Sequence, residues 1–449
     1  MKPWLPLFLS LVYFATSTCS HAQLLLSGSY SGKNPEANTT LILEFWEEDS
    51  WKNFESLPFA NNGTFNFSKP LIKSGQYRLR ISGSPNKQAH FLFNKEIQKG
   101  SLNILLNDQV LNGSVLAIDQ TEESIAYQEI MTEAEYFWKL RDSLKYKHPL
   151  VMESELALSK TASRISHAYP KTFTAQFICP LLHCPANIGS SVTNFDDSIE
   201  AIAKARFHNN QWSDSRFLRS SILVRQLNFD FYYYHDQNIE ADYIDSKMKM
   251  GLQNDTVQAF LFRFILDKMV DYKHEQGLEY LLTWYASDCT ENNQLADATK
   301  NLITALEHCE PGKKIESLVL PNLEGTRVPL EKIYQQSEFT AILFWRSSCN
   351  HCREFEPELE KLYEKYRSKG FSVYAINVDK EEQAWRNFCS QHSYPWPNVF
   401  LAYDSRKDFS KRFPVPSTPT LIAVDKEGKI IHRLIMRSKL EDILEDFFK

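Results

Sequence analysis

The sequence lacks a strong excess of charge of either sign. Its 449 residues carry 50 Lys and Arg against 56 Asp and Glu, a formal net charge of −6. A chain of this size with so small an imbalance has neither the basic field that binds nucleic acid nor an acidic tail. We therefore expect no nucleic-acid partner. At the usual ~100–200 residues per domain, the length indicates about three domains.

The sequence also lacks an apolar run of the ~20 residues that cross a bilayer. The apolar residues 4–14 follow Lys2 and precede small polar residues that end at Ala22. This order predicts a secretory signal peptide over residues 1–22, with cleavage after Ala22 and no transmembrane segment afterwards. We expect a periplasmic or cell-envelope protein. A lipid anchor at Cys19 is the alternative, although no aliphatic residue lies three positions before it.

Cysteine is scarce, with eight residues in the chain, and Cys19 lies in the signal region. The odd number left after export implies a free thiol or an intermolecular partner. In "CPLLHC", Cys179 and Cys184 flank His183, and we favour a local disulfide or two buried thiols over half a metal site. Pairing of Cys289 with Cys309 stays open. Disulfides persist outside the cytosol.

Two accessory regions precede the C-terminal part. Over residues 23–117, short β-branched and aromatic runs such as "QYRLRI" alternate strictly and are separated by Asn, Gly and Ser. This pattern predicts a β-sandwich domain. Over residues 118–310, apolar residues recur at helical spacing, as at Ile130, Ala134 and Phe137, which predicts a mostly α-helical domain. We interpret "FYYYH" in this region as helix core rather than a binding surface.

The last part alternates between strand and helix signals. We expect strands over 340–345, 371–378, 420–425 and 429–434, and helices over 350–369, 381–391 and 438–448. The predicted fold is thus multidomain: a β-sandwich, a helical domain and a C-terminal α/β domain over 313–449.

Cys349 and Cys352 lie where the first of these strands ends and a helix begins. Unpaired amides and the macrodipole at a helix N-terminus favour an anion, so the Cys349 thiolate is stabilised. Cys-x-x-Cys corners lower a cysteine pKa from ~8.5 to ~3.5–7.5. His351, between the cysteines, can add a cationic or hydrogen-bonding partner. We expect Cys349 to attack a substrate disulfide and the shielded Cys352 to resolve the mixed disulfide.

Two other uses of the pair compete with this chemistry. A zinc site would need more ligands, and Cys389 and His392 in "CSQH" are the candidates. A structural disulfide closing so small a ring would add little stability. Because Cys349 ends a core strand, we favour redox chemistry and expect Cys389 to be a buried structural thiol. We therefore expect neither a metal nor another cofactor.

A second feature lies far along the chain. In "FPVPSTPTLIAVD", Pro419 comes just before a strand, where its missing N–H costs no ladder hydrogen bond. A cis X–Pro bond at this position would be a specific structural device.

With "FWRSSCNHC" before a helix, Pro357 inside it and "STPT" before a late strand, residues 313–449 resemble the thioredoxin superfamily, and more closely the TlpA/ResA-like envelope thiol–disulfide oxidoreductases. The resemblance implies that cis-Pro419 faces the cysteines and that Thr418 binds extended substrate, with Trp345 contributing to the substrate site. It also implies disulfide-bearing protein substrates and a membrane-embedded electron donor.

This sequence departs from the family at three positions. Relatives often carry an acid three residues after the second cysteine, where this chain has Phe355 between Glu354 and Glu356. Leu343 replaces a buried Asp or Asn, and Ser348 replaces the aromatic before the first cysteine. The expected attack and resolution remain possible, while proton handling must differ.

We expect an exported oxidoreductase that reduces protein disulfides. Oxidation or isomerisation is the alternative direction, because a His between the cysteines recurs in such members. An envelope binding or assembly protein that uses the thioredoxin-like part as redox sensor or platform is the alternative from another class. A peroxiredoxin is disfavoured, because the Thr and Pro expected before its cysteine are absent from residues 344–348.

Overall fold

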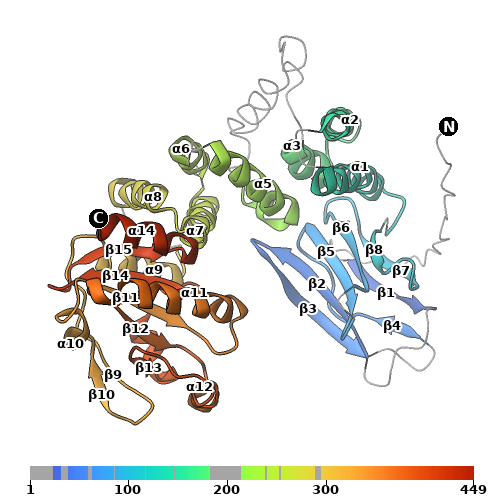
Figure 1. Ribbon diagram of the computed structural model, residues 1–449. Coiled ribbons are helices and arrows are strands. Elements are labelled where there is room, and N and C mark those ends of the chain that lie inside the picture. Colours follow the sequence, from blue (N-terminus) through green and yellow to red (C-terminus); the bar gives the residue numbers. More distant parts are fainter. Residues whose placement is uncertain are drawn as a thin grey trace. The chain divides into compact units, whose positions relative to one another are not determined.

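A computed structural model describes residues 24–31, 39–58, 63–84, 86–116, 118–144, 148–182, 214–237, 240–251, 254–288 and 295–449. The chain forms two compact units, Met1–Gln258 and Ala259–Lys449 (Figure 1). The predicted signal peptide, Cys19, Cys184 and Cys289 lie outside the described residues.

The first unit begins with strands that form two sheets. One sheet has the order β4-β1-β7 and the other β3-β2-β5-β6-β8, and their apolar side chains share one buried cluster. The strands are β1 (Leu24–Tyr30), β2 (Thr40–Glu47), β3 (Ser50–Pro58), β4 (Thr64–Asn66), β5 (Gly75–Ile81), β6 (Gln88–Phe93), β7 (Gly100–Leu106) and β8 (Asn112–Val115). The strand signals are confirmed, while the β-sandwich domain and its boundaries stay a prediction.

Strand β5 shows how this part differs from a sheet with one solvated face. Tyr77 and Leu79 are buried as the alternation predicts, but Gln76 on the opposite face is only 3% exposed. Its amide group donates to the Tyr127 hydroxyl and accepts from Ser221. The outer face of the strand is therefore partly covered by helices.

Helices follow the strands, as expected. They are α1 (Glu122–Leu144), α2 (Pro149–Ala168), the π-helix Thr174–Ile178, α3 (Cys179–Leu182), the 3₁₀ helix Ser215–Arg219, α5 (Ser221–Gln237), α6 (Glu240–Gly251), α7 (Asp255–Asp271), α8 (Glu275–Asp288) and α9 (Asp297–His308). In "FYYYH", Phe231 is buried in α5, and the side chains of the other four residues lie outside the described part.

The second unit contains a five-stranded sheet of order β13-β12-β11-β14-β15. Strand β11 pairs parallel with β12 and antiparallel with β14. The remaining elements are β9 (Val319–Pro321), β10 (Arg327–Pro329), α10 (Leu330–Tyr334), β11 (Phe339–Trp345), α11 (Asn350–Tyr366), β12 (Phe371–Asn377), α12 (Glu382–Cys389), β13 (Asn398–Phe400), α13 (Arg406–Phe409), β14 (Thr420–Asp425), β15 (Ile430–Ile435) and α14 (Leu440–Phe447), with short 3₁₀ turns Arg367–Lys369, Tyr403–Ser405 and Arg437–Lys439.

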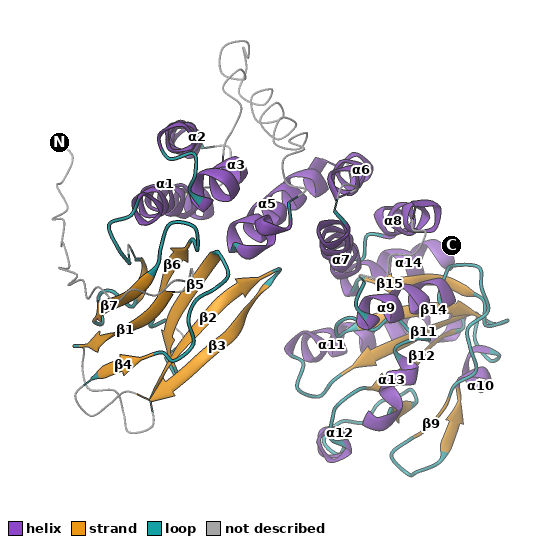
Figure 2. Ribbon diagram, turned by 180° about the vertical axis from the view of Figure 1, so that it is seen from behind, coloured by secondary structure: helices purple, strands orange, loops and turns teal. Residues whose placement is uncertain are grey.

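Both faces of this sheet are covered, which explains why every residue of β11 is buried. Alternate side chains of a strand point to opposite faces. Leu343 and Trp345 therefore pack with α11, α12 and α14, whereas Ile342 and Phe344 pack with α10 and α13. Helices on either side of the sheet are visible in Figure 2. The central strand is thus fixed in position, and its C-terminal end holds the Cys-x-x-Cys turn rigidly.

The α/β elements expected from the sequence are confirmed, with small shifts at their ends. Helix α11 ends at Tyr366, earlier than expected, and a 3₁₀ turn continues to Lys369. The three-residue strand β13 was not expected. Helix α9 also belongs to this unit, and Cys309, directly after it, packs with the apolar residues of the sheet's second face. Among the described residues, none of the helices has the length and apolar content needed to span a bilayer.

Candidate active site

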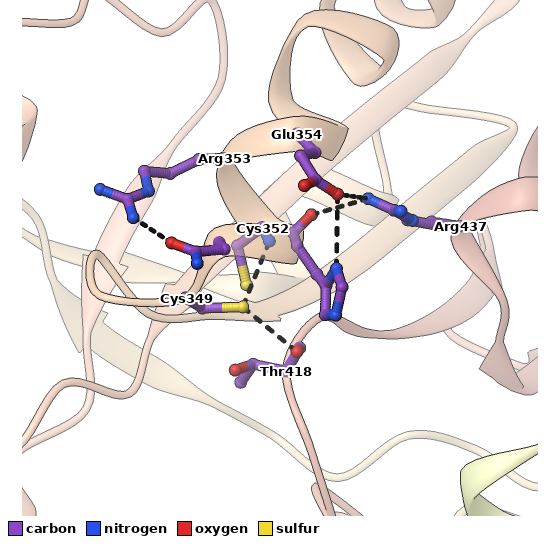
Figure 3. A network of polar contacts seen from close by, with 8 residues as sticks. Cys349, Cys352, Arg353, Glu354, Thr418 and Arg437 are labelled. Carbon is purple, nitrogen blue, oxygen red and sulfur yellow. Dashed lines mark hydrogen bonds and ion pairs between the residues drawn. The ribbon is translucent and has the colours of Figure 1, made fainter. Parts of the chain in front are cut away.

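The site is built on the turn between β11 and α11. Cys349 is the N-cap residue of α11, with φ −83° and ψ 112°, and its Sγ accepts a hydrogen bond from the backbone N of Cys352 at 3.2 Å (Figure 3). The first amides of a helix have no partner inside the helix, and the macrodipole adds partial positive charge. A sulfur at the N-cap therefore meets donors that stabilise its anion.

The surroundings of Cys349 favour the thiolate. Partial burial works to raise the pKa of this thiol. Hydrogen bonds with the side chains of Cys352 and Thr418 and with the backbone amides of Cys352 and His351 outweigh burial, so the pKa lies below its ordinary value. The residue remains partly exposed, so that a disulfide from outside can reach its sulfur.

Cys352 is the opposite case. It lies in the first turn of α11 and is only 6% exposed. Burial, followed by the hydrogen bond with Cys349 and the charge on that neighbour, raises the pKa of Cys352 to about 12. One motif therefore holds an accessible thiol poised to ionise and a shielded thiol that keeps its proton. This difference matches the roles of attacking and resolving cysteine.

The loop before β14 faces the cysteines. The Thr418–Pro419 peptide bond is cis, as expected from "STPT". The Cys349 thiol donates to the backbone O of Thr418 at 3.2 Å, and Figure 3 shows this sulfur between Thr418 and the amide of Cys352. Two distant segments of the chain therefore meet at one sulfur atom.

The side chains of His351 and Trp345 do not contact the Cys349 sulfur among the hydrogen bonds and ring contacts of the described residues. The imidazole of His351 is exposed and contacts the Glu354 carboxylate at 3.3 Å, and among the described residues it has no hydrogen bond to Cys349. Its backbone amide is what contacts the thiol. Trp345 is only 6% exposed and its ring packs against Phe388, so it lies beneath the surface that substrate would reach.

A small cavity of about 20 Å³ adjoins Cys352. Glu356 and Tyr394 line it together with Trp345 and Pro419. Among the described residues, the Glu356 Oε1 and the Tyr394 hydroxyl are buried and make no hydrogen bond of ordinary geometry. The two groups still interact, because burial, followed by hydrogen bonding with Glu356 and the charge of its carboxylate, raises the pKa of Tyr394. A buried carboxylate oxygen without a well-aligned donor can accept a proton.

Sequence reasoning considered Glu356 only as a neighbour of Phe355. Helix geometry contains the missing signal, because residues four apart lie on the same face. Glu356 is four residues after Cys352 and shares its cavity, whereas Phe355 packs in the apolar core. Tyr394 comes from the segment between α12 and β13, and no local pattern connects it to the motif.

The proposed zinc ligands do not come together. Over the described residues, which include Cys349, Cys352, Cys389 and His392, no group of three or more potential ligands could hold a metal ion. Cys389 is 4% exposed and packs in the same core as Cys352, as expected for a structural thiol. The His392 ring stacks on Phe388 instead.

The other described cysteines, Cys179 and Cys309, are buried free thiols. Burial raises the pKa of both to about 12. Cys309 donates to the backbone O of Arg412 at 3.3 Å, a contact within the second unit. Neither thiol lies in the site around Cys349.

Known proteins match the region that holds this site. A family model described as thioredoxin-like matches residues 337–430. The thiol-disulfide oxidoreductase ResA of Bacillus thuringiensis subsp. konkukian is 30% identical over 146 residues, which are 32% of this chain and 81% of that protein. ResA of Bacillus subtilis is 23% identical over 141 residues, 31% of this chain and 75% of that protein.

Solved structures match the same part. The thioredoxin domain of a thiol-disulfide oxidoreductase from Bacteroides vulgatus is 27% identical, with a TM-score of 0.29, and the match covers 31% of this chain and 99% of that domain. A domain of a possible thiol-disulfide isomerase from Cytophaga hutchinsonii is 32% identical, with a TM-score of 0.28, and covers 31% of this chain and 92% of that domain.

Proposed function

The chain belongs to the ResA-like thiol–disulfide oxidoreductases of the thioredoxin superfamily, and from this premise we propose that it is an exported reductase of protein disulfides that acts through Cys349 and Cys352. The observation that carries the proposal is the contrast within the motif: an accessible N-cap thiol whose pKa is lowered, next to a buried thiol whose pKa is raised.

The reaction consists of two exchanges. The Cys349 thiolate attacks one sulfur of the substrate disulfide, a mixed disulfide forms, and the other substrate sulfur leaves as a thiolate that takes a proton. Cys352 then loses its proton and attacks the Cys349 sulfur, which releases the second substrate thiol. The substrate gains two electrons and two protons, and the enzyme keeps a Cys349–Cys352 disulfide. A membrane electron donor, implied by the family, returns the pair to the dithiol.

The resolving step needs a base, and Glu356 is our candidate. Its Oε1 is buried, with the Tyr394 hydroxyl as a neighbour, in a cavity that Cys352 also lines. A volume of about 20 Å³ is close to the smallest space that holds one water molecule. In this proposal, the Cys352 proton passes to Glu356 through such a water. An acid one position beyond the usual family position would thus handle the proton.

Substrate binding involves the loop before β14. We assign the backbone of Thr418 to pair with an extended substrate segment, with Pro419 fixing the loop, as in strand addition. His351 contributes its backbone amide to the thiolate. Trp345 lines the cavity next to Cys352, so we propose that it contributes to substrate binding indirectly.

Reduction of insulin disulfides, with dithiothreitol as the final reductant, tests the function. Wild-type protein should accelerate the reaction, Cys349→Ser should lower the rate to background, and Cys352→Ser should accumulate a covalent adduct visible on a non-reducing gel. Cys389→Ala is the matched control and should retain activity. A wild-type protein with no turnover and no adduct in Cys352→Ser would favour the alternative of a binding protein with a redox-sensing module.

The direction of the reaction is tested by the reduction potential of the Cys349–Cys352 pair. A value near −270 mV marks a reductant and a value near −120 mV an oxidant, by comparison with thioredoxin and DsbA at roughly those potentials. We expect the reducing end of this range. An oxidising value would overturn the proposed direction and leave the exchange chemistry intact.

Location and domain layout complete the proposal. We propose export through a signal peptide over residues 1–22, followed by accessory regions over 23–117 and 118–310 and the thioredoxin-like domain over 313–449. Mass determination of protein from the cell envelope distinguishes cleavage after Ala22 from acylation at Cys19, because the two products differ at the first residue.

A further inference from the structure

A lysine from the helical region reaches the loop that carries the cis proline. Lys273 lies in the turn between α7 and α8, and its Nζ donates to the Oγ1 of Thr420 at 3.1 Å. The two residues are 147 positions apart, and both belong to the second unit. Thr420 directly follows Pro419 and is fully buried.

The backbone at Lys273 is unusual. Its φ is 54°, a left-handed conformation that L residues other than Gly and Asn rarely adopt. The turn is held by bonds from the backbone N of Lys273 to Val270 O and from that of His274 to Met269 O. Glycine is the usual residue at such a helix end. A lysine in a disfavoured conformation points to a use for its side chain.

A second contact fixes this turn against the sheet. Glu275, at the start of α8, forms an ion pair with the buried Arg433 of β15 at 2.7 Å. Arg433 also donates to the backbone O of Leu306 in α9. The ion pair therefore attaches the turn that carries Lys273 to strand β15, which limits the positions that the ammonium can take.

The hydroxyl of Thr420 connects the lysine to the loop. A threonine hydroxyl has one hydrogen, which Thr420 donates to Ser417 O at 2.7 Å. The lysine donates to a lone pair of the hydroxyl oxygen, and a charged donor strengthens such a chain of hydrogen bonds. Burial lowers the pKa of Lys273 to about 8, although Asp271 acts in the opposite direction, so that the group is mainly charged at neutral pH.

We propose that Lys273 is a positioning residue for substrate, which acts through Thr420 to hold residues 417–420 in the shape that accepts an extended polypeptide. This inference rests on the proposed function and deepens it. It assigns part of the helical segment before the thioredoxin-like domain to the catalytic unit. It also predicts that Lys273 matters for polypeptide disulfides, which need the Thr418 backbone, and little for small disulfides, which do not.

The test compares Lys273→Met with wild type in the full-length protein. We expect KM for a disulfide-bonded polypeptide to rise about tenfold, the factor that 1.4 kcal/mol gives, while kcat stays within about twofold. Reduction of a small aromatic disulfide should be unchanged within the same margin. Hydrogen exchange of the backbone amides in residues 417–421 should accelerate about tenfold, because the loop is no longer held in one conformation.

Further variants separate the contact from the backbone conformation. Lys273→Arg keeps a charged donor and should restore KM to near wild type. Lys273→Gly removes the ammonium and relieves the left-handed backbone, so it should fold at least as well as Lys273→Met and still show the raised KM. Lys411→Met, at an exposed lysine of the same unit, is the matched surface control.

Two results would overturn the inference. One is an unchanged polypeptide KM with unchanged hydrogen exchange in Lys273→Met and Lys273→Gly. The other is an equal loss for polypeptide and small disulfides. Neither result touches the proposed function, which the Cys349→Ser comparison tests by itself. Conversely, faster exchange at residues 417–421 without any wild-type turnover would support the contact and refute the function.

Discussion

Cysteines in two settings of the second unit behave in opposite ways. Cys349 caps a helix and meets backbone amides, and its pKa lies below the ordinary value. Cys309 and Cys389 lie among apolar side chains, and burial raises the pKa of each to about 12. The same side chain is therefore poised to ionise in one place and keeps its proton as a packing group in another. What decides between them is whether donors replace the water that burial removes.

The largest expected effect is a difference in alkylation rate between Cys349 and the two buried cysteines. In reduced protein at pH 7, we expect iodoacetamide to modify Cys349 at least about a thousandfold faster than Cys309 or Cys389, because only the thiolate reacts and the buried thiols hold their protons. Between pH 7 and pH 9 the thiolate fraction of Cys309 and of Cys389 rises about a hundredfold, whereas the thiolate fraction of Cys349 rises less. Peptide mass spectrometry measures each site. Equal rates at the three cysteines would break the comparison.

A smaller effect, on the rate at which the mixed disulfide is resolved, should come from replacing Glu356, the proposed proton acceptor. Glu356→Gln keeps the shape of the side chain and removes its basicity, so release of the mixed disulfide should slow about tenfold or more. Stopped-flow measurement of product release in a single turnover reports this step. Glu358→Gln, at an exposed position of the same helix, is the control. If Glu356→Gln released the product at the wild-type rate, the carboxylate would be excluded as the base for Cys352.

The smallest effect belongs to a buried thiol. Cys389→Ala removes one sulfur from the core and should lower the free energy of unfolding by about 1 kcal/mol, with activity within about twofold of wild type. Cys389→Ser should cost more, about 1–3 kcal/mol, because it buries a hydroxyl. Urea unfolding measures both. A loss of turnover in Cys389→Ala without a loss of stability would give this thiol a chemical role.

The turn that carries Cys349 and Cys352 was predictable because it is a local feature of the sequence. The strand, the turn and the helix are adjacent in sequence, and the N-cap position of Cys349 follows from where the helix begins. Pro419 could be placed by its position before a strand and by the family resemblance. In both cases a short stretch of residues contains the whole physical reason.

The rest of the site depends on long-range packing. Tyr394 reaches the cavity from another loop, and Lys273 reaches Thr420 from another helical turn. Trp345 lies on a strand that is covered on both sides and packs in the core, and its contribution to the substrate site stays a prediction. Such contacts depend on how elements pack, and one sequence by itself contains no pattern for them.

The strand order makes the surroundings of Cys349 depend on a late part of the chain. The sheet places β11 between β12 and β14, and Thr418, which faces Cys349, lies 69 positions further along the chain. During synthesis, Cys349 and its helix are therefore made before the loop that lies opposite them. The cysteine gains its full set of hydrogen bonds only after β14 has joined the sheet.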